Sequence, residues 1–283
     1  MRDNMCLLLI AFGQHRDYPL LLLANRDEFY QRPAAAAAPW QDQSLIAGRD
    51  LEAGGTWMGI APAGRVAAVT NIREPGVAPP ADVLSRGDIP VQFLTGTLPP
   101  QDFATQLPGH RYRGFNALLY AHGERPQLIC AGNRHEPFEL SPGYHGISNG
   151  APDSPWPKVE SGCKSLEQLV TRLHGNATRN LDNDNFVMPA LALLANDTRA
   201  PIERLPDTGV GTALERALSS IFVRIEDGDS GNQEQRGQSL TGGYGTRAST
   251  LVAVDRRGRT QLWEQSYVHG HASGPIRHYT SEY

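Results

Sequence analysis

The chain opens with two uninterrupted apolar runs, residues 6–12 and 19–24, separated by the polar segment 13–18. Apolar runs of this length on either side of a turn segment are typical of the two strands of a hairpin. Because neither run alternates between apolar and polar residues, both faces of these strands are expected to be covered. The pattern therefore predicts a sheet with one layer above it and another below.

Further along the chain, shorter segments bounded by glycine or proline have strand character: 56–60, 66–71, 115–121, 127–131, 146–148, 221–225, 250–255 and 261–265. Helical periodicity is clearest at 159–173 and 185–194, with a third short helix expected at 212–219, so the expected helices cluster in the second half. Residues 226–243 are polar and glycine-rich without apolar periodicity, which predicts a mobile loop. The pattern as a whole predicts an α+β protein rich in strands.

Composition agrees with that class and narrows it. The chain has 283 residues, with 29 glycines and 21 prolines, so we expect many turns between short elements and no helical bundle. Its length fits one large domain or two modest ones, and we expect a single domain over residues 1–283. No apolar stretch approaches the roughly 20 residues that span a bilayer, so no membrane span is predicted.

Charge and cysteine usage exclude several classes of partner. The formal net charge of -4 and a pI near 6.1 offer no general attraction to nucleic acid or anionic lipid. The three cysteines form no Cys-x-x-Cys pair, which favours reduced thiols and a cytoplasmic location. The run at 6–12 has the character of a signal sequence but lacks a small-x-small cleavage site.

Metal-binding patterns are weak. The segment Asp227-Gly-Asp229-Ser-Gly231 begins like a calcium loop, but a glycine stands at the fifth position. His269 and His271 lie in a polar tail that is expected to be solvated. No metal site is predicted.

The sequence carries a series of short motifs from one end to the other: Met5-Cys6, Asn25-Arg26-Asp27-Glu28, Gly54-Gly55-Thr56-Trp57-Met58-Gly59, Val69-Thr70-Asn71, Gly114-Phe115-Asn116, Gly146-Ile147-Ser148-Asn149, Pro155-Trp156-Pro157-Lys158 and Tyr244-Gly245-Thr246-Arg247. In order and content they resemble the NRDE family, the family of transport and Golgi organisation proteins. The resemblance implies an Ntn-hydrolase-like fold, a four-layer αββα sandwich of two antiparallel sheets.

The resemblance also implies that Cys6 is an N-terminal nucleophile, whose own α-amino group takes the thiol proton. An α-amine with a pKa of about 7.7 to 8.0 is partly neutral at pH 7 and suits this task. Similar proteins begin Met-Cys, whereas residues 1–4 precede that pair here. Either translation starts at Met5 or a short propeptide is removed. If neither happens, Cys6 has no free amine and the mechanism fails.

The remaining motif residues receive roles from the same resemblance. Arg26 and Arg247 would supply positive charge near the thiol, Asp27 would orient Arg26 or the amine, and Asn71 and Asn149 would bind the oxyanion. The expected ligand-binding residues are Asn25, Glu28, Trp57, Asn116 and Trp156.

Simpler interpretations remain open for several of these residues. Cys6 has the properties of a small buried hydrophobe, residues 25–28 those of a charged turn that ends a strand, and the two tryptophans those of core residues.

The sequence therefore supports two alternative functions. The first is hydrolysis of an amide or thioester, which needs no cofactor. The second is a carrier or chaperone that holds a small amphipathic ligand, either haem or an acyl-CoA-type lipid, in the same cleft.

Overall fold

The computed structural model describes residues 5–174, 180–225 and 242–282. Most of the loop expected at 226–243 therefore lies outside the described residues. In chain order the elements are β1 (Met5–Phe12), β2 (Leu20–Phe29), β3 (Ala34–Pro39), β4 (Ile46–Asp50), β5 (Met58–Ala61), β6 (Arg65–Asn71), α1 (Asp88–Thr95), α2 (Pro100–Gln106), η1 (Gly109–Arg111), β7 (Phe115–Ala121), β8 (Gln127–Gly132), β9 (Phe138–Glu139), β10 (Gly143–Ile147), α3 (Pro157–His174), η2 (Asn183–Val187), α4 (Met188–Leu194), η3 (Ile202–Arg204), α5 (Thr212–Ala217), β11 (Arg224–Ile225), β12 (Tyr244–Val254), β13 (Thr260–Val268) and β14 (His271–Ser281).

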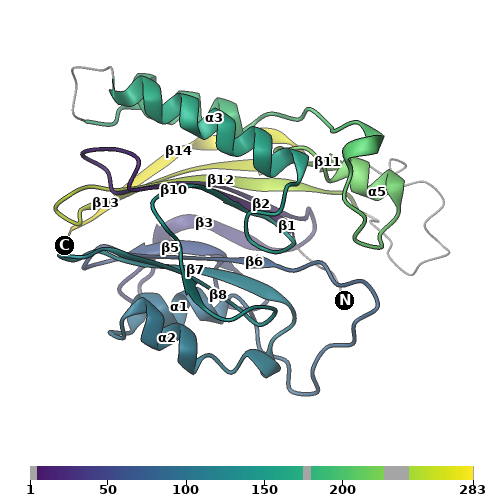
Figure 1. Cartoon of the computed structure of the whole chain (residues 1–283), viewed down its shortest axis with the longest axis horizontal. Coiled ribbons are helices and arrows are strands. Elements are labelled where there is room, and N and C mark those ends of the chain that lie inside the picture. The colour runs from purple at the N-terminus through teal and green to yellow at the C-terminus, as the bar shows by residue number, and fades with distance from the viewer. Residues whose placement is uncertain (1–4, 175–179, 226–241, 283) are drawn as a thin grey trace.

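Within the described residues the strands form two seven-stranded antiparallel sheets. Sheet A has the order β10-β1-β2-β12-β13-β14, with β11 beside β12, and sheet B runs in sequence order from β3 to β9. The two sheets lie face to face, with α3 across the outer face of sheet A and α1 and α2 beneath sheet B (Figure 1). This αββα order of two antiparallel sheets confirms the predicted four-layer sandwich.

The first two strands show why the layers form. They pair as the predicted hairpin, with Phe12 opposite Leu20. Successive side chains of a strand point to opposite faces, so Leu7 and Leu9 pack in the core under the helices while Leu8 packs in the core between the sheets. Both faces are therefore apolar, and the prediction of a covered sheet is confirmed.

Two interpretations need correction. The alternative interpretation of residues 25–28 as a turn that ends a strand is wrong, because these residues belong to β2, which is buried along its whole length. Helices are also not confined to the second half, since α1 and α2 lie in the first. The sequence pattern does not indicate these two helices, because each is at most eight residues long and α1 contains a proline. His269 and His271 are exposed, as expected, and His271 begins β14, an edge strand whose polar sequence suits one open side.

No helix in the described part of the chain is both long and apolar enough to cross a membrane.

Candidate functional site

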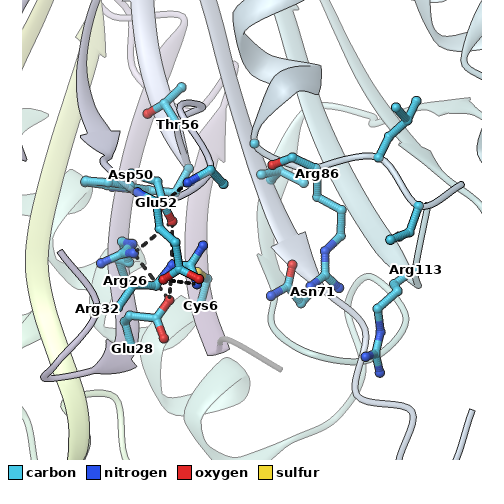
Figure 2. A pocket seen from close by; sticks show the side chains of 17 residues that line it. Cys6, Arg26, Glu28, Arg32, Asp50, Glu52, Thr56, Asn71, Arg86 and Arg113 are labelled. Atoms are coloured by element: carbon cyan, nitrogen blue, oxygen red, sulfur yellow. Dashed lines mark hydrogen bonds and ion pairs between the residues drawn. The ribbon is translucent and has the colours of Figure 1, made fainter. Parts of the chain in front are cut away.

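A cleft of about 510 Å³ opens between the sheets, at the end where β1 starts and β2 finishes. Its lining includes residues from those two strand ends, from the ends of β4 and β6, and from the segment 83–87 ahead of α1. Figure 2 shows the labelled side chains as two groups that face each other. A volume of this size suits a small-molecule ligand.

Cys6 and Arg26 lie side by side at one wall of this cleft. They pair across the antiparallel ladder, and directly paired residues share a face of the sheet. That face is the one between the sheets, because Leu8 and Ala24, the next residues along it, pack in the inter-sheet core. Alternation then directs residues 25 and 27 toward the helix layer. The four-residue motif is thus divided between two faces of β2.

The Cys6 thiol is strongly disfavoured as a thiolate in this environment. Its side chain is 7% exposed. Burial raises the pKa of Cys6 to about 12, and the negative charge of Asp27 adds to the effect, while Arg26 and a backbone hydrogen bond with Asp27 oppose it. A reaction at this sulfur near neutral pH therefore needs a base that removes its proton.

Arg26 is held by two carboxylates, those of the buried Glu28 and the partly buried Asp50. Its Nη2 lies 3.3 Å from Glu28 Oε2 and 3.6 Å from Asp50 Oδ2. Arg32 Nε contacts the same two groups, at 3.5 Å from Glu28 and 2.7 Å from Asp50. Arg32 Nη1 also lies 3.0 Å from Glu52 Oε2, and these ion pairs offset part of the desolvation that burial imposes. Arg26 Nη1 is buried without a hydrogen-bond partner among the described residues, so a donor remains for a ligand.

The facing wall carries Asn71, Arg86 and Arg113 (Figure 2). Trp57 also lines the cleft, and its ring centroid lies 4.5 Å from Cζ of Arg26, a distance typical of a cation–π contact. The cleft therefore combines aromatic and apolar surface with guanidinium groups from both walls. This combination suits an amphipathic ligand that carries an anionic group.

Asn149 lies behind Asn71 and is not among the cleft-lining residues described. Its Nδ2 donates to the backbone carbonyl of Asn71 at 2.8 Å. The neighbouring Ser148 Oγ donates to the carbonyl oxygen of Cys6 at 3.3 Å. These bonds connect the end of β6 and the start of β1 to the segment after β10, so Asn149 supports the wall while the Asn71 side chain lines it.

Arg247 is likewise outside the described lining of the cleft. The register of β12 against β2 shifts at this residue, and such bulges redirect a side chain. Its Nη1 donates to the backbone carbonyls of Phe29 at 3.1 Å, Tyr30 at 2.9 Å and Arg32 at 3.3 Å. The guanidinium thus holds the chain segment that carries Arg32 into the cleft.

Three residues expected to bind a ligand, Asn25, Asn116 and Trp156, also lie outside the described lining. Asn25 Nδ2 donates to the carbonyls of Leu194 and Ile221, each at 2.9 Å, and so joins sheet A to the helix layer. The Asn116 amide bonds to a β6 side chain and to a carbonyl after β10. Trp156 packs against the core under the helices.

A second polar site lies on the helix side of β2. Thr246 Oγ1 donates to Asp27 Oδ1 at 2.7 Å, whereas Asp27 Oδ2 and Lys158 Nζ have no hydrogen-bond partner among the described residues. Burial raises the pKa of Asp27 to about 6, with the charge of Lys158 opposing the rise. Burial lowers the pKa of Lys158 to about 8, with Asp27 as the main opposing charge. Asp27, expected to orient Arg26 or the amine, thus lies on the helix side of β2, where the nearby charge of Lys158 acts on it.

Sequence reasoning missed Lys158 although it ends one of the motifs. The signal was available: a proline suits the first position of a helix, so Pro157 places Lys158 in the first turn, where a cation is disfavoured. It also missed cleft residues outside the motifs, which only the fold brings together: Arg32, Asp50, Glu52, Arg86 and Arg113. In the described part of the chain, no group of three His, Cys, Asp or Glu side chains is placed to hold a metal ion.

Comparison with known proteins agrees with the resemblance that the motifs show. Residues 5–269 match the family described as Transport and Golgi organisation 2. The Transport and Golgi organization protein 2 homolog of Bos taurus is 33% identical over 294 residues, which cover 96% of each chain. The homolog of Homo sapiens is 32% identical, with 93% of each chain covered.

Among solved structures, a mutant of the conjugated bile acid hydrolase from Clostridium perfringens aligns over 98% of both chains, with a TM-score of 0.47 and 7% identity. The family assignment rests on the sequence matches, which extend over most of the chain. This chain belongs to the Transport and Golgi organisation 2 family.

Proposed function

We propose that this chain is a cysteine hydrolase that cleaves an amide or thioester bond, with Cys6 as the nucleophile. The observation that carries the proposal is the shared cleft wall of Cys6 and Arg26, where Nη1 of Arg26 is a buried donor without a partner among the described residues. Acyl transfer needs a nucleophile and, close to it, donors for the negative oxygen of the tetrahedral intermediate. Asn71, which lines the same cleft, is the second candidate donor.

In the proposed reaction, Cys6 Sγ attacks the substrate carbonyl carbon as the thiol proton passes to a base. The carbonyl oxygen becomes negative and accepts hydrogen bonds from Arg26 and Asn71. Collapse of the intermediate expels the amine or thiol, which takes up the proton, and leaves an acyl thioester on Cys6. Water then releases the carboxylic acid and restores the thiol.

The base in this scheme is the α-amino group of Cys6, freed by cleavage of the peptide bond after Met5. Met5 pairs with Asp27 at the start of β1, so this bond lies beside the cleft. The ordinary pKa of an α-amine, about 7.7 to 8.0, suits proton transfer near neutrality. The high pKa of Cys6 gives the base its importance, because without one the sulfur stays protonated.

The test uses the full chain with a panel of N-acyl amides and acyl thioesters. We expect Cys6→Ala to reduce turnover at least about a thousandfold, as removal of a covalent nucleophile does. The half-buried Cys163 provides the matched control, and Cys163→Ala should retain turnover. Acid quenching should trap an acyl group on the peptide with Cys6, and intact mass should show Cys6 as the first residue. Equal turnover by the parent and Cys6→Ala would refute the proposal.

A carrier is the second candidate, favoured by the raised pKa of Cys6, which describes an unreactive thiol. The apolar and cationic cleft would then hold an acyl-CoA-type lipid or haem without breaking it. Among the described lining residues, Cys6 alone belongs to a type that commonly ligates haem iron. Saturable binding of the thioester panel or haem, with no turnover by the parent, would favour the carrier.

A further inference from the structure

Lys158 occupies a position that is unfavourable for a lysine in two respects. Its side chain is 3% exposed, although an ammonium group is stable chiefly in water. It also lies in the first turn of α3, where the positive end of the helix dipole repels a cation. An apolar side chain would fill the same space without either penalty, so a nearby negative group must compensate.

The compensating group is Asp27. Of the charges that act on Lys158, Asp27 on β2 is the strongest favourable one, and Cys6 on β1 and Glu215 on α5 also favour the ammonium, whereas Arg73 after β6 opposes it. Glu215 is already engaged, because its Oε2 lies 2.7 Å from Arg73 Nη1.

Asp27 has one oxygen left over for this role. Thr246 bonds to Oδ1, while Oδ2 and Lys158 Nζ are both buried without a hydrogen-bond partner among the described residues. Two orphaned atoms of opposite charge in one buried layer act on each other electrostatically, although no direct hydrogen bond joins them.

This pair lies on the opposite face of sheet A from the Cys6 side chain, next to it along the ladder. Asp27 pairs with Met5, the residue before Cys6, and its charge is the largest one that disfavours the thiolate. Glu28 acts in the same direction and Arg26 in the opposite one. A positive charge on the helix side of the sheet that offsets the charge of Asp27 therefore favours the thiolate without placing another cation in the cleft.

We propose that Lys158 is a positioning residue which, through Asp27, makes the Cys6 thiol easier to ionise. Its importance for turnover rests on the proposed hydrolase function, but its effect on the sulfur does not. The reactivity of Cys6 toward a small electrophile measures that effect whether or not the protein is an enzyme.

The experiment follows alkylation of the folded full chain by iodoacetamide between pH 7 and 10, with each modified cysteine identified by peptide mass spectrometry. Only the thiolate reacts. Loss of one nearby positive charge raises a pKa by about one unit, so Lys158→Met should alkylate Cys6 about tenfold more slowly near pH 7. The difference should shrink as pH rises through about 8, the pKa at which Lys158 of the parent loses its charge. Lys158→Arg keeps the charge and should restore most of the rate.

Cys163 is an internal control in the same helix. The causes of its own raised pKa are burial and Asp153, not Lys158, so its alkylation should be unchanged. An unchanged Cys6 profile in folded Lys158→Met would overturn the proposal, and so would equal slowing of Cys163, which would indicate a general change of structure.

Asp27→Asn gives a second route if Lys158→Met does not fold. Removing the carboxylate should speed alkylation of Cys6, and adding Lys158→Met to that variant should change the rate by less than about threefold, because both residues act through one pair. A full tenfold effect in the double variant, or no acceleration in Asp27→Asn, would show that Lys158 does not act through Asp27. Failure of the hydrolase proposal would leave all these rates untouched.

Discussion

At the scale of single residues, the motif on β2 performs two tasks because its side chains alternate. Arg26 and Glu28 enter the cleft, where they pair with each other. Asn25 and Asp27 face the helix layer, where Asn25 makes structural hydrogen bonds and Asp27 keeps an unbonded oxygen. Consecutive residues in one motif therefore differ in what they do, and the ionisation of Asp27 can be tested separately.

We expect Asp27→Asn to change how stability depends on pH. The pKa of Asp27, about 6 in the folded protein, exceeds its ordinary value of 3.8, so the folded state binds the proton more tightly than the unfolded chain. Stability contributed by this group is present below about pH 4 and is lost as pH rises through about 6. A shift of this size corresponds to at most about 3 kcal/mol. In urea denaturation, the free energy of unfolding of Asp27→Asn should rise relative to that of the parent as pH increases from 4 to 7.

Asp42→Asn supplies the control with the opposite sign. A hydrogen bond from Arg49 lowers the pKa of Asp42, an exposed carboxyl. Its contribution to stability is therefore present at neutral pH and is lost as pH falls. The free energy of unfolding of this variant should therefore rise relative to that of the parent only toward acid pH. Parallel stability curves for the parent and Asp27→Asn would contradict the expected role of Asp27.

At the scale of elements, the bulge in β12 connects the sheet to the cleft. The register shift allows the Arg247 guanidinium to reach three carbonyls at and just beyond the end of β2. Arg32, whose side chain contacts three cleft carboxylates, lies in the segment so held. Arg247 thus shapes the cleft through the backbone, in contrast to the direct role expected from its motif.

Arg247→Met should destabilise the protein by about 2 to 3 kcal/mol, because it removes charge-assisted hydrogen bonds to three backbone carbonyls. Amide exchange should accelerate in the residues just after β2, at 30–33. Arg224→Met is the matched control, since Arg224 Nη2 donates to one carbonyl, that of Gly270. Equal losses of unfolding free energy in the two variants, with no local change in exchange, would argue against the clamp.

The elements also show how far the sequence predicts this fold. Long apolar runs give β1 and β2, and the predicted strand at 115–121 coincides with β7. The short helices α1 and α2 and the polar edge strand β14 lack such a signal, because neighbours in space decide their structure. The site follows the same rule: Cys6 and Arg26 stand in motifs, whereas Arg86 and Arg113 are brought to the cleft only by the folded chain.

At the scale of the whole molecule, the cleft depends on two sheets holding a fixed separation. Most of the contact between them is apolar, formed by side chains that project inward from both sheets. One buried carboxylate also bridges them. Glu264 on β13 of sheet A accepts a hydrogen bond from the Ala37 N–H on β3 of sheet B at 2.6 Å, and another from Thr250 Oγ1 at 3.2 Å. This bond is directional, whereas the apolar contact around it is not, so it fixes how β3 lies against β13.

Two replacements of Glu264 distinguish the contribution of its hydrogen bond to stability from that of its charge. Glu264→Leu leaves the Ala37 N–H buried without an acceptor and should lower the free energy of unfolding by about 2 to 3 kcal/mol, whereas Glu264→Gln keeps a carbonyl acceptor and should lose less. Burial raises the pKa of Glu264, so the parent loses stability as pH rises through that raised value, and the glutamine variant does not. In urea denaturation, the difference in free energy of unfolding between the parent and Glu264→Gln should therefore become smaller from pH 5 to pH 8. A leucine variant as stable as the parent at both values would show that apolar packing alone holds the sheets together.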